Sequence, residues 1–198
     1  MKVVVIGASG TIGKAIVAAL GGHEVIEVSR SSGQHRADIE DKASLERLFA
    51  ELGEVDAIIS AAGGGAWKPL AELTDADFAK SLSYKLMGQV NVLRTGLAAL
   101  RKGGSITLTT GVLAREPTPG SAAISLINSG VEGFARAAAL ELNGTARVNV
   151  VSPPWVSETL VAMGQDGSGG MPAAAVAKVY ATVVLGDDTG QIIDARKA

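Results

Sequence analysis

The chain has 198 residues, 47% of them hydrophobic and 19% charged, so it is too apolar to be disordered and long enough to bury one sizeable core. Its formal net charge of -2 disfavours a nucleic-acid-binding protein, which needs a basic face. Cysteine is absent, which excludes disulfides, thiolate metal sites and cysteine nucleophiles, and two histidines are too few for a histidine-built zinc site.

The first half of the chain alternates between predicted strands and helices. Val3 to Ile6 is a continuous β-branched run, typical of a strand buried on both faces and too short for a signal-peptide core or a membrane span. Apolar residues at helical spacing follow it and end at Gly21-Gly22. The pattern then predicts a strand at 24–28, a helix at 41–49 with Asp41 as its N-cap, and a strand at 55–59.

The second half continues the alternation. Thr74 to Asp77 resembles a capping box and opens a long helical region that runs to about Leu100. The pattern then predicts a strand at 105–110, a helix at 121–142, a strand at 147–151, a helix at 172–185 and a strand at 191–194. Between them, 164–170 is a low-complexity stretch that we expect to form a flexible flap. This alternation predicts the α/β class: a single doubly wound domain over 1–198, with a parallel sheet and helices on both faces.

Three glycines spaced by three residues, Gly7, Gly10 and Gly13, lie between the first strand and the first helix. Gly7 permits a sharp turn, Gly10 lets the backbone approach a pyrophosphate, and Gly13 lets the helix pack closely on the strand. The helix N-terminus offers free N–H groups and partial positive charge to phosphates, and Ser9 and Thr11 can add hydroxyl donors. We therefore predict a dinucleotide-binding turn, to which a purely structural tight turn is the alternative.

The second strand is followed by Arg30, Ser31 and Ser32. An NAD-selective site usually places a carboxylate near this point, where it accepts a hydrogen bond from the ribose 2′-hydroxyl. Arg30 instead offers a planar fork that suits a 2′-phosphate, with Ser31 and Ser32 as auxiliary donors. The pattern favours NADP(H) over NAD(H); a solvated surface arginine is the alternative.

With these pieces in place, the chain resembles the short-chain dehydrogenase/reductase family, whose members bind NAD(P) on a Rossmann fold. The resemblance covers nearly the whole length, and beyond the glycine turn it is carried by Ala37–Ile39, Ser60–Gly63, Gly104–Thr110, Gly130–Leu142, Val148–Pro154 and Thr189–Ile193. The further cofactor-binding residues that it implies are Ile12, Asp38, Ile39, Ala61, Ala62, Gly63, Asn128, Pro153 and Val156. It also implies a homodimer or homotetramer packed through the helical regions at 90–100 and 121–142, with intrachain packing as the alternative.

The resemblance fails at the family's catalytic positions. Its proton-donating tyrosine falls at Ile124, and the lysine four residues later falls at Asn128. An isoleucine cannot donate a proton, and Asn128 has no charge with which to lower a neighbour's pKa, although its amide can hydrogen-bond a ribose hydroxyl. The family's active-site serine falls at or beside Thr110, and its helix asparagine falls at Lys85.

Lys85 and Thr110 are the candidate catalytic residues. Beside the nicotinamide, Lys85 would stabilise an alkoxide, or donate a proton if burial brings its pKa to about 7–8; an exposed helix lysine is the alternative. Thr110 would hydrogen-bond a substrate carbonyl unless it only packs in its strand. Tyr84 adjoins Lys85, but successive helix residues point apart, so we expect it to serve the core or an interface. Two tryptophans, Trp67 and Trp155, either wall an apolar substrate pocket or pack in the core.

The sequence therefore predicts a cytoplasmic, NADP(H)-dependent oxidoreductase. It would reduce a ketone, imine or activated double bond of a small molecule without the family's tyrosine acid. The alternative is a catalytically silent NADP(H)-binding protein that acts as a redox sensor or scaffold. No feature of the sequence supports a nucleic-acid or membrane partner.

Overall fold

The computed structural model describes residues 1–198 and contains one sheet of seven strands. All neighbouring strands are parallel, in the order β3-β2-β1-β4-β5-β6-β7. The strands are β1 (Lys2–Ile6), β2 (Glu24–Ser29), β3 (His35–Arg36), β4 (Val55–Ser60), β5 (Leu100–Thr109), β6 (Arg147–Ser152) and β7 (Ile192–Asp194). The order turns back between β1 and β4, which confirms the doubly wound Rossmann arrangement.

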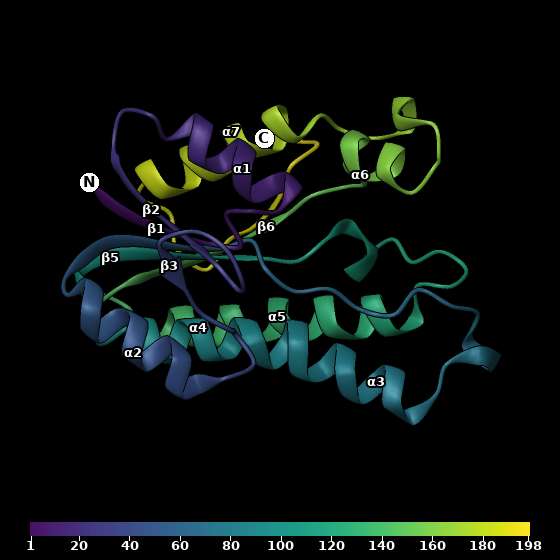
Figure 1. Cartoon of the computed structure of the whole chain (residues 1–198), viewed down its shortest axis with the longest axis horizontal. Helices are drawn as coiled ribbons and strands as arrows, with labels where there is room; N and C mark the ends of the chain where they lie inside the picture. Colours follow the sequence, from purple (N-terminus) through teal and green to yellow (C-terminus); the bar gives the residue numbers. More distant parts are fainter.

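Helices cover both faces of the sheet (Figure 1). On one face lie α1 (Thr11–Ala19) and α7 (Ala173–Leu185), and on the other lie α2 (Lys42–Leu52), α4 (Gly88–Gly96) and α5 (Ala122–Glu141). The shorter helical elements are α3 (Asp75–Ser81), α6 (Ser157–Ala162), the 3₁₀ turns η1 (Leu70–Glu72), η3 (Val112–Ala114) and η4 (Gly167–Gly169), and the π-helical turn η2 (Leu82–Met87). None of the helices combines the length and apolar character that crossing a bilayer requires.

The alternating side chains of β1 divide between two apolar cores. Val4 and Ile6 pack into the core beneath α2, α4 and α5, whereas Val3 and Val5 pack into the core beneath α1 and α7. All four are buried. Burial on both faces explains why this strand is apolar without alternation.

Capping residues in the sequence correctly predicted the starts of two helices. The Asp41 side chain accepts a hydrogen bond from the Ala43 N–H at the start of α2, and Thr74 with Asp77 forms a complete capping box at the start of α3. The long helix expected from this box is not one regular α-helix. It continues through η2 into α4 and ends at Gly96, because Leu100 already pairs with Val55 in the sheet.

The short strand β3 and the short helix α6 were not predicted, and the expected flap contains a 3₁₀ turn. β3 has two residues and pairs only with β2, and α6 has six residues, so neither carries a readable period. Within 164–170, Asp166 accepts a hydrogen bond from the Ser168 N–H at the start of η4. The stretch that we expect to form a flap therefore contains one short 3₁₀ turn.

Candidate active site

The turn between β1 and α1 is built from glycine because no side chain would fit. Gly7 has φ +89°, and a β-carbon on it would lie 2.9 Å from the backbone of Ala61 and Ala62. A β-carbon on Gly13 would lie 2.0 Å from the carbonyl oxygen of Gly7. The N-cap of α1 is Gly10, which has no side chain to satisfy the first N–H groups of the helix. These groups remain available for an anion.

A cavity of about 240 Å³ adjoins this turn and the carboxyl ends of β2 and β4; we call it the turn pocket. The predicted cofactor residues that line it are Gly7, Ser9, Gly10, Arg30, Asp38, Ile39, Ala61, Ala62 and Gly63. Ile6, Ala37 and Tyr84 complete its wall. Residues from five separate chain segments thus meet at one cavity.

Eight predicted cofactor residues do not line the turn pocket. Five of them are close to it in the sequence, Thr11, Ile12, Gly13, Ser31 and Ser32, and the other three are Asn128, Pro153 and Val156. Gly13 is buried under the turn, where its role is to let α1 approach β1. The Ser32 hydroxyl lies 3.0 Å from the Ser29 hydroxyl, so it helps to shape the end of β2.

Arg30 stands at the rim of the turn pocket without a carboxylate partner. It forms no ion pair, and its guanidinium carbon lies 5.6 Å from the centre of the Tyr84 ring. Its side chain is exposed. The guanidinium donors are therefore free to meet a phosphate.

A second cavity of about 150 Å³ lies at the carboxyl ends of β5 and β6; we call it the lysine pocket. The predicted residues that line it are Lys85, Thr110, Asn128 and Pro153, with Gly111, Val112, Leu113, Ile124, Pro154 and Trp155 as the remaining wall. Val156 is buried at the start of α6 and does not line it. Most of the surface that lines this pocket is apolar.

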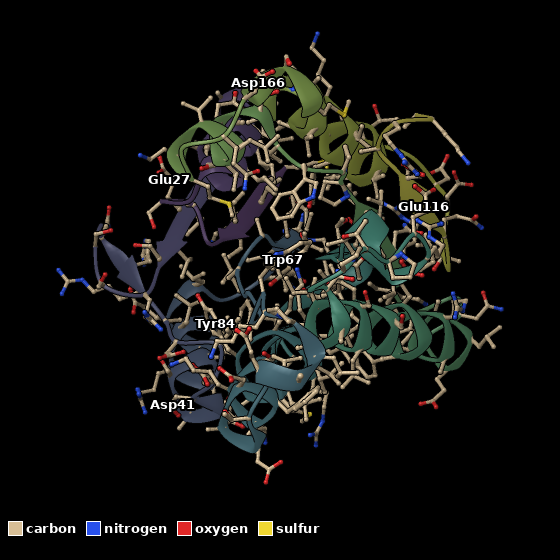
Figure 2. All side chains as sticks on the ribbon, turned by 90° about the vertical axis from the view of Figure 1, so that its right-hand side faces the viewer. Glu27, Asp41, Trp67, Tyr84, Glu116 and Asp166 are labelled. Atoms are coloured by element: carbon tan, nitrogen blue, oxygen red, sulfur yellow. The ribbon has the colours of Figure 1, made fainter.

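Trp155 and Trp67 form an edge-to-face pair, with ring centres 5.2 Å apart and planes at 68°. Figure 2 looks at the side of the molecule that is on the right in Figure 1 and shows Trp67 near the middle of this face, with Tyr84 below it. Trp67 is 40% exposed, so the pair lies at the surface beside the lysine pocket and not in the core.

Lys85 is half-buried in the π-helical turn η2, packed against Gly63. A β-carbon on Gly63 would lie 3.0 Å from the Lys85 α-carbon, so the two pockets adjoin at this contact. Its Nζ donates one long hydrogen bond, 3.4 Å, to the carbonyl oxygen of Thr110 and meets no carboxylate. Burial lowers the pKa of its ammonium group to about 8. The group can therefore give up a proton near neutral pH.

The hydroxyl proton of Thr110 is directed away from the lysine pocket. Thr110 Oγ1 donates to Glu132 Oε1 over 3.4 Å, and Glu132 Oε1 also lies 3.8 Å from Arg115 Nε. Glu132 is only 5% exposed. With its proton committed to Glu132, Thr110 offers the pocket an acceptor lone pair, which leaves the ammonium of Lys85 as the strong donor.

Asn128 lines the lysine pocket and has a buried side-chain acceptor without a hydrogen-bond partner. Its side chain is buried within α5, and its Oδ1 has no hydrogen-bond partner. A buried acceptor without a partner costs free energy until a donor reaches it. A ribose hydroxyl is such a donor. This orphaned oxygen and the glycine cradle of the turn pocket together suit a nicotinamide dinucleotide.

Sequence reasoning missed two polar residues of the site. Tyr84 was expected in the core or an interface, yet it also lines the turn pocket, because a π-helical turn does not keep the α-helical directions. The spacing of apolar residues in the sequence does not predict such a turn. Glu132 follows Thr110 by 22 residues, and only the packing of α5 against the end of β5 brings them together.

The chain is similar to known oxidoreductases in sequence and in structure. The family described as enoyl-(acyl carrier protein) reductase matches residues 11–191. Hydroxynaphthalene reductase arp2 of Aspergillus fumigatus is 27% identical over 146 residues, 69% of this chain and 54% of that protein. Hydroxynaphthalene reductase-like protein Arp2 of Metarhizium anisopliae is 26% identical over 191 residues, 86% of this chain and 72% of that protein.

Two solved structures match almost the whole chain. The crystal structure of protein lin1944 from Listeria innocua has a TM-score of 0.92 and 38% identity, and the match covers 98% of both chains. A small-chain dehydrogenase solved in complex with NADPH has a TM-score of 0.86 and 26% identity, over 98% of this chain and 95% of that one.

Proposed function

This chain belongs to the short-chain dehydrogenase/reductase family, and we propose that it is an NADP(H)-dependent oxidoreductase in which Lys85 replaces the missing tyrosine acid. Its substrate would be a small molecule with a ketone, imine or activated double bond. The observation that carries this proposal is the half-buried ammonium group in an apolar pocket beside the turn pocket, with its pKa lowered to about 8.

The residues that would hold the cofactor line the two adjoining pockets. The N–H groups at the start of α1 would bind the pyrophosphate, Arg30 the 2′-phosphate, and Asn128 a ribose hydroxyl. Asp38 and Ile39 would lie beside the adenine. When bound, NADPH supplies the hydride. The solved relative that contains NADPH supports this choice of cofactor.

Lys85 would act on the oxygen or nitrogen of the substrate that becomes negative during reduction. Its ammonium group stabilises that charge and donates the proton. The carbonyl oxygen of Thr110 accepts a hydrogen bond from Nζ, and the apolar walls around Ile124 and Trp155 would lower the local dielectric around a bound substrate, which would strengthen the electrostatic interaction. Thr110 thus assists by positioning the lysine.

The exposed surface of α5 supports the expected homodimer or homotetramer. Leu126 and Leu140 lie on α5 with 49% and 81% of their surface exposed. Apolar side chains at that exposure gain free energy when a second copy covers them. The paired helices would be α4 and α5.

A steady-state assay of NADPH oxidation over a panel of ketones, cyclic imines and conjugated enones tests the proposed activity. Turnover that depends on both the enzyme and the carbonyl-type compound is the expected result. Tight NADPH binding by calorimetry without turnover on any member would instead favour a silent NADP(H)-binding protein. That second function draws support from the loss of the family's tyrosine and lysine at Ile124 and Asn128.

Replacing Arg30 by alanine is expected to weaken NADPH at least about tenfold while NADH changes little, because only NADPH carries the phosphate that Arg30 would pair with. Dissociation constants from titration calorimetry measure this difference. Lys178→Ala is the matched control, since it removes an exposed cation of α7. Equal losses for both cofactors would contradict the 2′-phosphate assignment.

Reduction is expected to slow at alkaline pH because the proton-donating form of Lys85 is lost. With a pKa of about 8, its ammonium group is protonated below that pH and becomes neutral above it. The kcat/KM for a non-ionising ketone should therefore change little between about pH 6 and about pH 7.5. At pH values well above 8 it should fall about tenfold per pH unit. A profile with no fall up to pH 10 would contradict the role of Lys85.

A further inference from the structure

We propose that Tyr84 is a specificity-determining residue that holds Arg30 in place for the 2′-phosphate of the cofactor. This inference rests on the proposed use of NADP(H). Tyr84 does not itself pair with the phosphate in this proposal. It acts through Arg30, and is therefore a positioning residue.

The two side chains meet across the mouth of the turn pocket from different parts of the chain. Arg30 directly follows β2, Tyr84 belongs to η2, and both line the pocket. The guanidinium carbon lies 5.6 Å from the ring centre, within the range of a cation–π contact. Arg30 forms no ion pair with any carboxylate of the chain. The ring is thus the contact that restrains an otherwise exposed arginine.

The mobility of a free arginine explains why such a restraint matters. A long exposed side chain samples many rotamers, and ordering it on ligand binding costs free energy. A ring on one side of the guanidinium plane reduces that cost and leaves the edge donors free for a phosphate. Tyr84 is well fixed for this purpose, because it is only partly exposed and packs against the core beneath α2 and α4.

The π-helical turn places this ring and the ammonium of Lys85 on adjoining pockets. Tyr84 lines the turn pocket, and the next residue, Lys85, lines the lysine pocket. Single π-helical turns inside helices occur frequently at functional sites. The same turn would therefore serve both cofactor choice and proton donation.

Two nucleotides that differ only in the 2′-phosphate provide the test, adenosine 2′,5′-bisphosphate and adenosine 5′-monophosphate. Their affinities are measured by titration calorimetry on the full chain and on four variants, which are Arg30→Ala, Tyr84→Leu, Tyr84→Phe and the double variant Arg30→Ala/Tyr84→Leu. Tyr84→Leu should weaken the bisphosphate about two- to fivefold, the loss that a surface cation–π contact predicts, and leave the monophosphate unchanged.

The ring, and not the hydroxyl, carries the proposed effect, so Tyr84→Phe should bind both nucleotides like the native chain. The double variant should bind the bisphosphate no more weakly than Arg30→Ala alone, because the ring acts only through the arginine. Thermal melting of each variant checks that the fold is retained.

Three results would overturn the role of Tyr84. These are equal weakening of both nucleotides by Tyr84→Leu, no weakening of either, and additive losses in the double variant. The first would mean that the ring contacts the adenosine itself. If Arg30→Ala fails to weaken the bisphosphate selectively, the proposed NADPH preference itself is contradicted. The arginine variant therefore separates failure of the proposed function from failure of this inference.

Discussion

Replacing Lys85 by methionine is expected to lower kcat for NADPH-dependent reduction by about 10²- to 10³-fold, the usual cost of removing one donor from a developing oxyanion. Methionine retains an unbranched stem that can pack against Gly63, but it has no charge and no proton to donate. Affinity for NADPH should stay within about twofold, because Lys85 would act on the substrate, whereas the start of α1, Arg30 and Asn128 would hold the cofactor. The change should thus appear in kcat.

Steady-state kinetics with saturating NADPH measures this loss, and calorimetry measures the retained affinity. Lys178→Met is the matched control, since Lys178 is an exposed lysine on α7 and lines neither pocket. The alkaline fall in kcat/KM should also disappear in Lys85→Met, because the titrating group is gone. A variant that keeps more than a third of the native kcat, roughly the scale of a lost surface charge, would remove Lys85 from the mechanism.

The resemblance implies that lysine and asparagine have changed places in this site relative to the family pattern. On that matching, the family's lysine position falls at Asn128 and its helix asparagine position falls at Lys85. Both side chains line the lysine pocket, so the cation is kept while the wall that carries it changes. The position of the tyrosine is filled by the apolar Ile124, which adds to the low polarity around the ammonium group. That environment lowers the pKa of Lys85.

The fold was readable from the sequence because its signals are local. The apolar run of β1, the glycine turn and the capping residues Asp41 and Thr74 each report on a few neighbouring residues. Alternation of strands and helices then leaves few topologies, and the doubly wound order follows from right-handed crossovers. β3 was not predicted, because it has only two residues and they are held by pairing with β2.

The polar detail of the site was not readable, because it depends on contacts between distant segments. The sequence placed Thr110 beside the substrate as a donor, but the packing of α5 directs its proton to Glu132. Likewise, α-helical spacing predicted that Tyr84 points away from Lys85 into the core or an interface, whereas in the structure Tyr84 also meets Arg30 from the π-helical turn η2. The role of Thr110 depends on one hydrogen bond, and that of Tyr84 depends on one extra residue in a helical turn. Neither feature produces a periodic pattern in the sequence.

Gly13→Ala is expected to destabilise the fold by about 3 kcal/mol and to weaken dinucleotide binding, because the new β-carbon has no space. It would lie 2.0 Å from the carbonyl oxygen of Gly7 and 2.8 Å from the α-carbon of Ala8. Both atoms belong to the backbone, so no side chain can rotate away. The start of α1 must instead move off β1, and its free N–H groups move with it.

Urea unfolding measures the loss in free energy, and calorimetry with NADPH measures the loss in affinity. Gly22→Ala is the matched control, since a β-carbon on Gly22 meets no atom within 4 Å and the substitution should change stability by no more than about 0.5 kcal/mol. If Gly13→Ala unfolds like the native chain and binds NADPH equally well, the close approach of α1 to the turn is not what holds the anion-binding N–H groups. If stability falls but affinity is retained, the pyrophosphate is not bound at this helix start, and the assignment of the turn pocket is wrong.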